Sequence, residues 1–402
     1  MQMFTPTRAA GLARLSDFVP QAGSDYARRR NHDLPGHDNV SRLSPWLRHR
    51  LVTEEEVIAA VTDRHGADMA GKFLAEVGWR LYFKGWLELR PGVWDNYKAE
   101  RDAAWNRVQT ESGLRRAWED ACTGETGIDA FDHWARELAE TGYLHNHARM
   151  WFASIWIFTL GLPWTLGADF FLRHLLDGDP ASNTLSWRWV SGLHSRGKTY
   201  LADADNIARY TDGRFRPDGL AQEAPALTGP DHPKPRPCPV SDRFDPVPRS
   251  GLLLTEDDLY PDDLLARGLT PVVTATVQAT ARRSHLAVAP RVGAFTAGAI
   301  ADCTSRLADR IGPVTACTNG REVVEWARVN GLSQVVMYHA PTGPARDALA
   351  GLRATLDADG ITLSVQIREI DALAWPRATA GYFKFRDVLP QIVAQSGPDL
   401  DQ

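Results

Sequence analysis

The sequence predicts two unlike domains, an all-helical domain followed by a smaller doubly wound α/β domain of the Rossmann-like kind. Helical spacing of apolar residues continues to about residue 212, a proline-rich stretch follows, and short β-rich runs then alternate with helical segments. We therefore expect a helical domain at 1–215, a linker at 216–250 and an α/β domain at 251–402. With 402 residues, 44% of them hydrophobic, the chain can bury two cores.

Helical periodicity is clearest in the first domain, where strand-like alternation is scarce. The stretches that carry it are 53–64, 67–87, 130–141, 144–160 and 167–176. The following segment, 216–250, is dense in proline and polar residues, which neither continue a helix nor bury a core. It is predicted to be the linker.

The second domain has five short apolar runs that are expected to be strands. They are Gly251–Leu254, Val272–Val277, Val314–Cys317, Val335–Tyr338 and Ile361–Ile367, and helical patterns at 294–311, 319–330 and 343–358 separate several of them. This alternation implies a mostly parallel sheet covered on both faces. A ligand of such a sheet would lie beyond the carboxyl ends of its strands, but no GxGxxG or P-loop motif marks one.

Charge and cysteine content narrow the function classes. The formal net charge of −5 gives no global attraction for polyanions, so nucleic-acid binding would need a local basic patch. The four cysteines are far apart and form no CxxC pair, which disfavours a metal site and a disulfide framework. Without a long apolar segment or a signal-like N-terminus, we expect a cytoplasmic protein with no membrane partner. The oligomeric state stays open.

Polar residues crowd the segment LLDGDPASNTLSWRWVSG, between an apolar helix and two tryptophans. Asp177, Asp179 and Asn183 would cost several kcal/mol if they were buried without partners, so we expect them to meet a polar ligand such as a heterocycle. Arg149 lies in an otherwise apolar helix and needs a carboxylate, for which Asp177 is the candidate. For any single one of the 14 tryptophans, a place in a helical core is an equal alternative.

Four motifs, in the right order over residues 8–190, resemble the FAD-binding domain of the DNA photolyase/cryptochrome family. SRLSPWL resembles its TSRLSPYL turn, EVGWRLYF its ExxWREFY motif, TGYLHNHARM its TGWMHNRLRM motif, and DGDPASNTLSWRW its DGDLAxNxGxWQW motif. Val40, Leu81, Tyr143 and His147 depart from these patterns, and the sequence after Trp189 departs from the common family sequence. The chain thus resembles a divergent branch, with its α/β domain after the helical domain instead of before it.

The resemblance implies FAD as the cofactor. Serine hydroxyls and backbone N–H groups that open a helix suit the FAD pyrophosphate, and Asn183 is implied to face flavin N5. The implied cofactor-binding residues are Tyr26, Ser41, Arg42, Leu43, Ser44, Arg80, Asn146, Arg149, Asp177, Asp179 and Asn183.

The resemblance also implies light-driven repair of cyclobutane pyrimidine dimers in DNA. Glu76 would bond the dimer, Trp79 and Trp189 would flank it, and Asn146 and Met150 would form the next wall. A (6-4) enzyme is expected to carry histidines where Asn146 and Met150 stand, so their identity favours cyclobutane dimers. Damaged DNA is then the partner, and single strands are a candidate form because the overall charge is weakly acidic.

Electron transfer in the family runs through a chain of tryptophans. Trp187 and Trp164 match its first two members by spacing, and Trp105 is the candidate for the outer member because Thr110 stands at the matching position.

Two alternatives remain, a cryptochrome-like blue-light photoreceptor without repair activity and a non-photochemical FAD-binding module. The retained dimer pocket favours the enzyme, whereas His147 and the acidic charge count against it. His147 is more readily interpreted as a hydrogen-bonded structural residue. The second domain has a weak resemblance to the family's antenna domain, in GLLLTEDDLYPDDLLARG and AGYFKFRDVLPQI, and an unrelated doubly wound module is the alternative.

Overall fold

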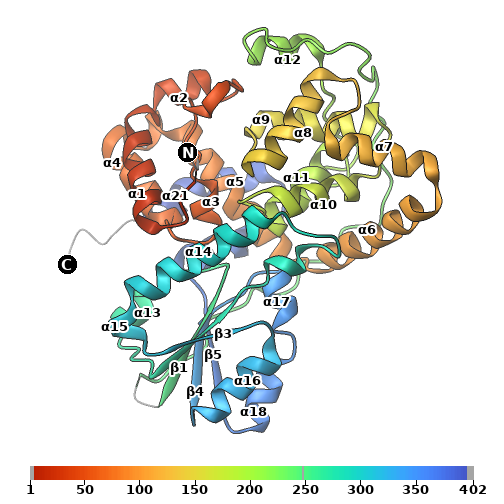
Figure 1. Ribbon diagram of the computed structural model, residues 1–402. Helices are drawn as coiled ribbons and strands as arrows, with labels where there is room; N and C mark the ends of the chain where they lie inside the picture. Colours follow the sequence, from red (N-terminus) through yellow and green to blue (C-terminus); the bar gives the residue numbers. More distant parts are fainter. Residues whose placement is uncertain (1–3, 247–248, 396–402) are drawn as a thin grey trace.

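The structure is a computed structural model that describes residues 4–246 and 249–395. A helical body built from the first half of the chain lies against one end of a five-stranded sheet, as Figure 1 shows. The predicted fold class, a helical domain followed by a doubly wound α/β domain, is confirmed. None of the helices in the described part of the chain is both long enough and apolar enough to span a membrane.

Local sequence signals set the ends of several helices in the helical body. A Thr53/Glu56 capping box opens α4, Asp179 caps α11 ahead of Pro180, and Gly142 ends α8 in the left-handed conformation. The helices are α1 (Arg8–Phe18), α2 (Ser24–Arg29), α3 (Ser44–Arg48), α4 (Glu54–Met69), α5 (Gly71–Glu88), α6 (Gly92–Thr110), α7 (Ser112–Thr123), α8 (Asp129–Thr141), α9 (Asn146–Ser154) with a π-helical turn at Ile155–Thr159, α10 (Trp164–His174), α11 (Pro180–Val190) and α12 (Ala204–Tyr210).

The sheet is entirely parallel, with the strand order β3-β2-β1-β4-β5. Its strands are β1 (Ser250–Thr255), β2 (Val273–Val277), β3 (Val314–Cys317), β4 (Gln334–Tyr338) and β5 (Thr362–Gln366), each within a residue of the predicted bounds. Leu252 and Leu254 of β1 face the core shared with α14 and the helical body, whereas Leu253 faces the core under α16 and α18. The central strand is therefore buried on both sides.

The helices around the sheet are α13 (Asp262–Ala266), α14 (Pro290–Arg306), α15 (Ala308–Ile311), α16 (Gly320–Val329), α17 (Pro344–Ala348) and α18 (Leu352–Ala358). Two predicted helices are each divided. The stretch 294–311 is split between α14 and α15, and 343–358 between α17 and α18, where Gly351 has a φ of +77° that a continuing helix does not allow.

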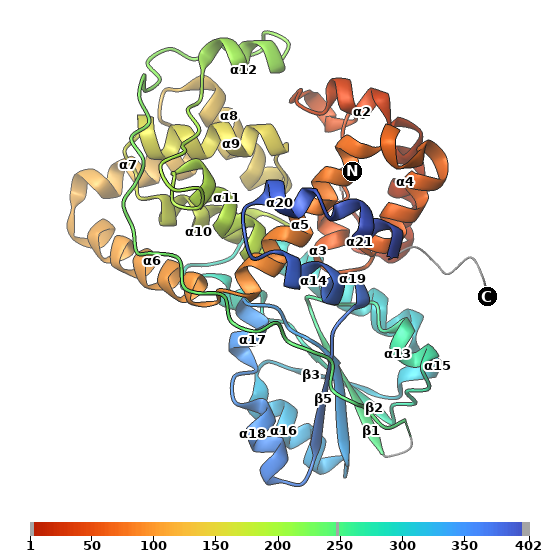
Figure 2. The same cartoon turned by 180° about the vertical axis from the view of Figure 1, so that it is seen from behind.

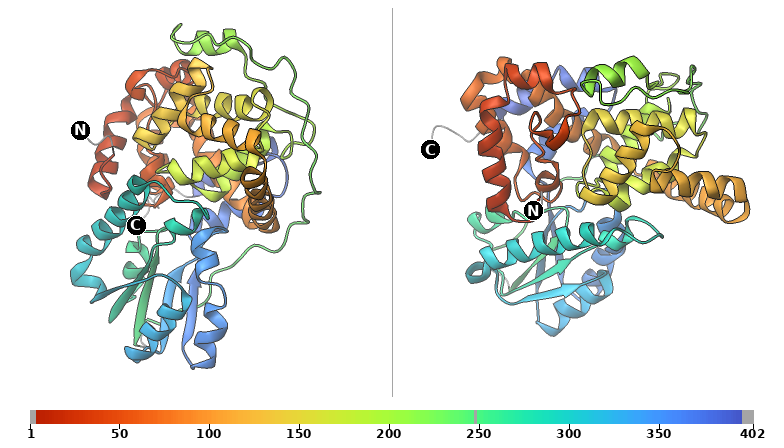
Figure 3. Two further views of the ribbon diagram at one scale, coloured as in Figure 1. Left: turned by 45° about the vertical axis from the view of Figure 1, so that its right-hand side comes forward. Right: turned by 45° about the horizontal axis from the view of Figure 1, so that its top comes forward.

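The proline-rich segment carries no helix or strand over 216–246 and runs along the outside of the molecule from α12 to the sheet, as Figure 3 shows. Its backbone is tied down on the way, since Arg236 donates to the carbonyl of Leu89 and Asp242 to that of Val365.

The last helices return to the helical body instead of the sheet. They are α19 (Glu369–Ala374), α20 (Tyr382–Arg386) and α21 (Leu389–Gln395), and they contact α5 and α4. Figure 2 shows them in dark blue in front of α5. Two glycines of α5 allow this approach, because a Cβ at Gly78 would lie 2.6 Å from the Leu389 side chain and one at Gly85 2.8 Å from the Trp375 backbone. Residues 369–395, which fall within the expected 251–402 domain, thus pack on the helical body.

The carboxyl end of β1 meets the helical body through buried charges. Arg48 pairs with Asp257, and Arg50 pairs with Asp258 at 3.1 Å and with Asp371 at 2.7 Å. At this point, between β1 and β4, the described residues leave a cavity of only about 10 Å³. That is the space of a single water, so the helical body occupies the crevice where a doubly wound sheet would hold a ligand.

Candidate functional site

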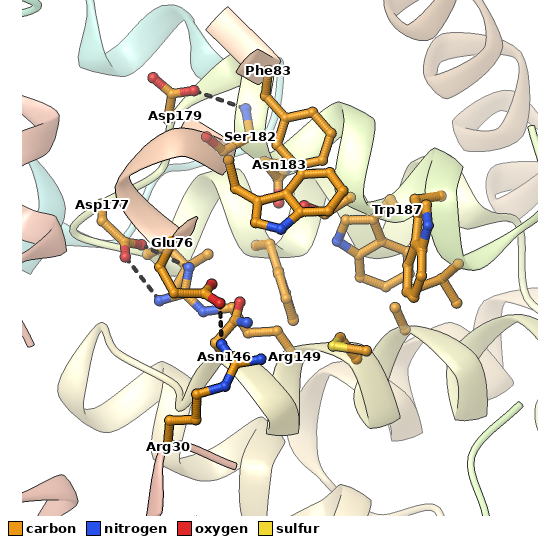
Figure 4. Close-up of a pocket in the computed structure, with 18 residues that line it drawn as sticks. Arg30, Glu76, Phe83, Asn146, Arg149, Asp177, Asp179, Ser182, Asn183 and Trp187 are labelled. Atoms are coloured by element: carbon orange, nitrogen blue, oxygen red, sulfur yellow. Dashed lines mark hydrogen bonds and ion pairs between the residues drawn. The ribbon is translucent and has the colours of Figure 1, made fainter. Parts of the chain in front are cut away.

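Two adjoining cavities, of about 310 and 400 Å³, lie inside the helical body. The smaller is drawn in Figure 4. Their combined size suits a large cofactor, since ligand pockets commonly measure about 300–1,000 Å³. The residues that line both cavities are Arg30, Glu76, Asn146, Arg149, Met150, Asp177, Asp179 and Ser182.

Asp177 and Arg149 form the charged wall between the cavities. The guanidinium donates to both carboxylate oxygens, at 3.1 and 2.8 Å, and its Nε donates to the carbonyl of Leu144 at 3.0 Å. This confirms Asp177 as the carboxylate that Arg149 needs. Because the two side chains already neutralise each other, they present a fixed dipole to the cavity instead of a free charge.

The start of α11 supplies two further polar groups. Asp179 accepts from the backbone N–H of Ser182 at 2.8 Å and lies 3.6 Å from Arg80. Burial alone would raise the pKa of Asp179, but the positive charges of Arg80 and Arg48 nearby outweigh burial and lower this pKa to about 2. The carboxylate therefore stays ionised. The amide nitrogen of Asn183 donates to the Ala168 carbonyl at 2.8 Å, which orients its amide oxygen, and Asn183 lines the smaller cavity.

Glu76 projects from α5 into the same space and is held by Arg30 at the end of α2. The two form an ion pair, each side chain about 30% exposed, as Figure 4 shows. Arg30 lines both cavities and belongs to the site, although it was not among the predicted site residues. The sequence signal available for Arg30 was its position four residues after Tyr26, about one helical turn.

Aromatic rings form the apolar walls of the smaller cavity. Trp79 and Trp189 both line it, and Trp189 packs against Tyr200 with ring centroids 5.8 Å apart. The other support comes from α20, where the Tyr382 ring stacks on Trp79 at 3.5 Å with an interplanar angle of 11°. The Tyr382 hydroxyl donates to the Ala75 carbonyl at 2.7 Å, which fixes this stack from the far end of the chain.

The larger cavity is lined by the remaining predicted cofactor residues. They are Tyr26, Ser41, Arg42, Leu43, Ser44 and Arg80. Arg42 has a φ of +53° and is bound to Asp38 and to the Gly36 carbonyl, so its backbone turns sharply just before α3. Arg80 donates to Glu54 at 3.0 Å and to the Leu47 carbonyl at 3.0 Å, which ties α3 and α4 to α5.

The three predicted electron-transfer tryptophans differ in the residues and cavities that they contact. Trp187 lines the smaller cavity and packs against α10 at Gly167. A Cβ at Gly167 would lie 2.2 Å from the indole, so only glycine leaves room for the ring. The ring of Trp164 contacts Tyr97 of α6, with centroids 5.8 Å apart. Trp105 lies eight residues further along α6, about 12 Å away along the helix, and its ring contacts are with Trp118 and His285. The arrangement therefore favours Tyr97 over Trp105 beside Trp164.

The histidines of the HNHARM stretch are bound within the protein. His147 contacts the Asn31 carbonyl at 2.9 Å and the Tyr200 hydroxyl at 3.3 Å, and its ring stacks on Trp151. His145 caps α9 through its Nδ1. His147 thus has the contacts expected of a structural residue.

In the described part of the chain, no group of His, Cys, Asp or Glu side chains could hold a metal ion.

Acid is expected to destabilise the protein from about pH 6.5 downward. Burial lowers the pKa of His145 to about 3 and that of His49 well below its ordinary value. Below about pH 6.5 the unfolded chain therefore binds protons that the folded chain cannot, and stability falls with pH. From pH 7 to 5 the protonation of His145 in the unfolded chain alone removes about 2 kcal/mol from the free energy of unfolding, and His49 adds to this loss; urea denaturation at the two pH values measures it.

The variant His145→Asn isolates the contribution of His145. Asparagine is also a good N-cap, so α9 keeps its start. The loss between pH 7 and 5 should shrink by about 2 kcal/mol in the variant. An unchanged loss would show that His145 is not buried in its neutral form.

Comparison with known proteins agrees with this geometry. The family described as the FAD binding domain of DNA photolyase matches residues 73–212. This stretch is thus similar to the FAD-binding domain of the DNA photolyase/cryptochrome family. The deoxyribodipyrimidine photo-lyase of Streptomyces griseus is 36% identical over 163 residues, which are 40% of this chain and 34% of that protein. The one of Thermus thermophilus is 35% identical over 194 residues, 47% of this chain and 43% of that protein.

Among solved structures, a bacterial class III photolyase from Agrobacterium tumefaciens is similar at 27% sequence identity and a TM-score of 0.42, over 51% of this chain and 44% of that one. The chain thus spans less than half the length of these relatives.

FAD is the cofactor of the domain that residues 73–212 match, and the cavities fit it. Trp187 lines the smaller cavity, and its buried indole N–H has no hydrogen-bond partner among the described residues. No described hydrogen bond occupies the amide oxygen of Asn183, which a heterocycle could use. The residues present therefore offer the unpaired donors and acceptors, the apolar walls and the volume that a flavin requires.

Proposed function

We propose that this chain is a light-driven lyase that splits cyclobutane pyrimidine dimers in DNA. Reduced FAD, when bound, absorbs blue or near-ultraviolet light and supplies the electron for the reaction. The observation that carries the proposal is the smaller cavity, in which Glu76, Trp79 and Trp189 stand beside the Asp177–Arg149 wall. The relatives named deoxyribodipyrimidine photo-lyase support it.

Each residue of the proposed dimer pocket has a role that its chemistry allows. The carboxylate of Glu76, oriented by Arg30, accepts a hydrogen bond from a pyrimidine N–H. Trp79 and Trp189 offer apolar surfaces to a flipped nucleotide, which must leave the base stack to reach the cavity. Asn146 and Met150, on α9, complete the wall opposite α5.

The larger cavity is the proposed place of the FAD phosphates and adenosine. The hydroxyls of Ser41 and Ser44 and the backbone of the turn between them line it. Tyr26 lines its far side. Arg80, which donates to the Leu47 carbonyl and lies 3.6 Å from Asp179, connects α3 with the start of α11.

The test is illumination of the reduced protein with an oligonucleotide that carries one thymine dimer, as a single strand and as a duplex. The proposal predicts that the dimer disappears in light and not in darkness. If both substrates keep their dimers under light that changes the flavin absorbance, the repair proposal is wrong and the cryptochrome-like alternative takes its place.

Photoreduction of the bound flavin is predicted to depend on Trp164 and not on Trp105. Trp164→Phe should slow blue-light reduction in the presence of a thiol at least tenfold, because Trp164 is the second member of the tryptophan chain that the family resemblance implies. Trp105→Phe, a matched change of a tryptophan whose ring contacts are with Trp118 and His285 and not with Tyr97, should leave the rate within twofold. The flavin absorbance measures both rates, and equal slowing by the two variants would contradict the assignment.

A further inference from the structure

The short helix α20 has one face buried and one face open. Tyr382 and Phe385 are 6% and 1% exposed and anchor the helix on α5, whereas Phe383 is 71% exposed. Among the exposed large hydrophobic side chains of the described residues, Phe383 is the only aromatic one. An exposed ring on a firmly anchored helix costs little entropy when it binds, which favours a contact role.

Basic groups surround this ring. Lys384 and Arg386 are exposed on the same helix, and the Arg386 guanidinium lies 5.2 Å from the centre of the Phe383 ring. Lys72 of α5 is exposed three residues before Ala75, whose carbonyl binds Tyr382. The carboxylate facing this group is Asp387, 3.7 Å from Arg386. The local charge is therefore positive in a chain whose net charge is −5.

α20 also packs against a residue that lines the proposed dimer pocket. Its Tyr382 ring covers one face of Trp79, and Trp79 lines the smaller cavity. Phe383 is the next residue along α20, and its side chain faces solvent. Figure 2 shows α20 lying over α5, between α11 and α21.

We propose that α20 binds a single DNA strand next to the cavity, with a base stacked on Phe383 and the adjoining phosphates on Lys384 and Arg386. An aromatic ring with flanking cations is the usual platform for single strands, because every unpaired base has a free π-face and every nucleotide carries a phosphate. In a duplex the neighbouring base pairs cover those faces. The contact thus selects single strands, which deepens the proposed function and rests on it.

The test measures binding in the dark, with fluorescent oligothymidylate and a duplex of the same length, by anisotropy. Phe383→Ala should weaken single-strand binding about tenfold, since stacking on one base contributes about 1–3 kcal/mol, and should change duplex binding less than twofold. Lys384→Ala should weaken single-strand binding and lower the slope of log affinity against log salt by about 0.7. Phe383→Tyr should restore wild-type affinity.

Val329→Ala is the matched control, because Val329 is 75% exposed on α16, away from the helical body. Unchanged single-strand affinity in Phe383→Ala, an equal loss on duplex, or no single-strand binding by the wild type would each overturn the proposal. Illumination of an isolated dimer dinucleotide, which has no base for Phe383, tests the repair function separately. If the Phe383→Ala protein repairs this dinucleotide, the proposed repair function stands even when the proposed strand contact is wrong.

Discussion

Glu76→Ala is expected to lower kcat/KM for light-driven dimer repair by tenfold or more while the protein keeps its FAD. The carboxylate is the only acidic group on the α5 wall of the smaller cavity among the described residues, and Arg30 holds it in place. A hydrogen bond to a charged group contributes about 1.5–3 kcal/mol, which corresponds to a factor of about 10–150.

Glu76→Gln separates the charge from the shape. Glutamine keeps an acceptor oxygen of the same reach but not the ionic bond with Arg30, so its repair rate should lie between those of the wild type and Glu76→Ala. Flavin absorbance and the denaturation midpoint, measured for all three proteins, exclude loss of cofactor or fold. Repair by Glu76→Ala at the wild-type rate would remove Glu76 from the dimer pocket.

Arg50→Ala is expected to have the largest effect on stability. Arg50 is buried and pairs with Glu54 of α4 at 3.2 Å, Asp258 after β1 at 3.1 Å and Asp371 of α19 at 2.7 Å. It therefore joins the helical body, the sheet and the C-terminal helices. Removing it leaves buried carboxylates without that partner, and breaking a buried pair commonly costs about 3–5 kcal/mol. Urea denaturation should show a loss at the upper end of this range.

Arg328→Ala is the matched control for Arg50. Arg328 pairs with Asp359 at 2.7 Å, but its side chain is 50% exposed, so solvent screens the pair and its removal should leave the urea midpoint almost unchanged. Equal losses in the two variants would mean that Arg50 does not hold buried charges together.

Part of the helical site could be predicted from the residues alone because three of its polar side chains are close together in the sequence. Asp177, Asp179 and Asn183 lie within one turn and the start of one helix, and Arg149 could be matched to Asp177 because a buried arginine needs a carboxylate. The strands could be placed because apolar runs between helices leave few alternatives.

What the sequence could not predict depends on contacts between distant segments. Tyr382 stacks on Trp79 from about 300 residues away, and neither residue carries a local signal of the other. The choice of Tyr97 over Trp105 required the relative position of α6 and α10. The division of the 343–358 helix depended on Gly351, whose freedom in φ shows only in the backbone.

Titration of the flavin-free protein with FAD tests the central claim, that the Asp177–Arg149 wall and Asn183 surround the flavin. The account predicts uptake of one FAD by the wild type and at least tenfold weaker binding by Asp177→Ala and Asn183→Ala. Asp169→Ala should bind within about threefold of the wild type, because Asp169 is also buried and paired with an arginine, Arg173 at 2.9 Å, but lines neither cavity. A wild-type protein that takes up no FAD, or an Asp177→Ala protein that binds it as tightly as the wild type, would contradict the account.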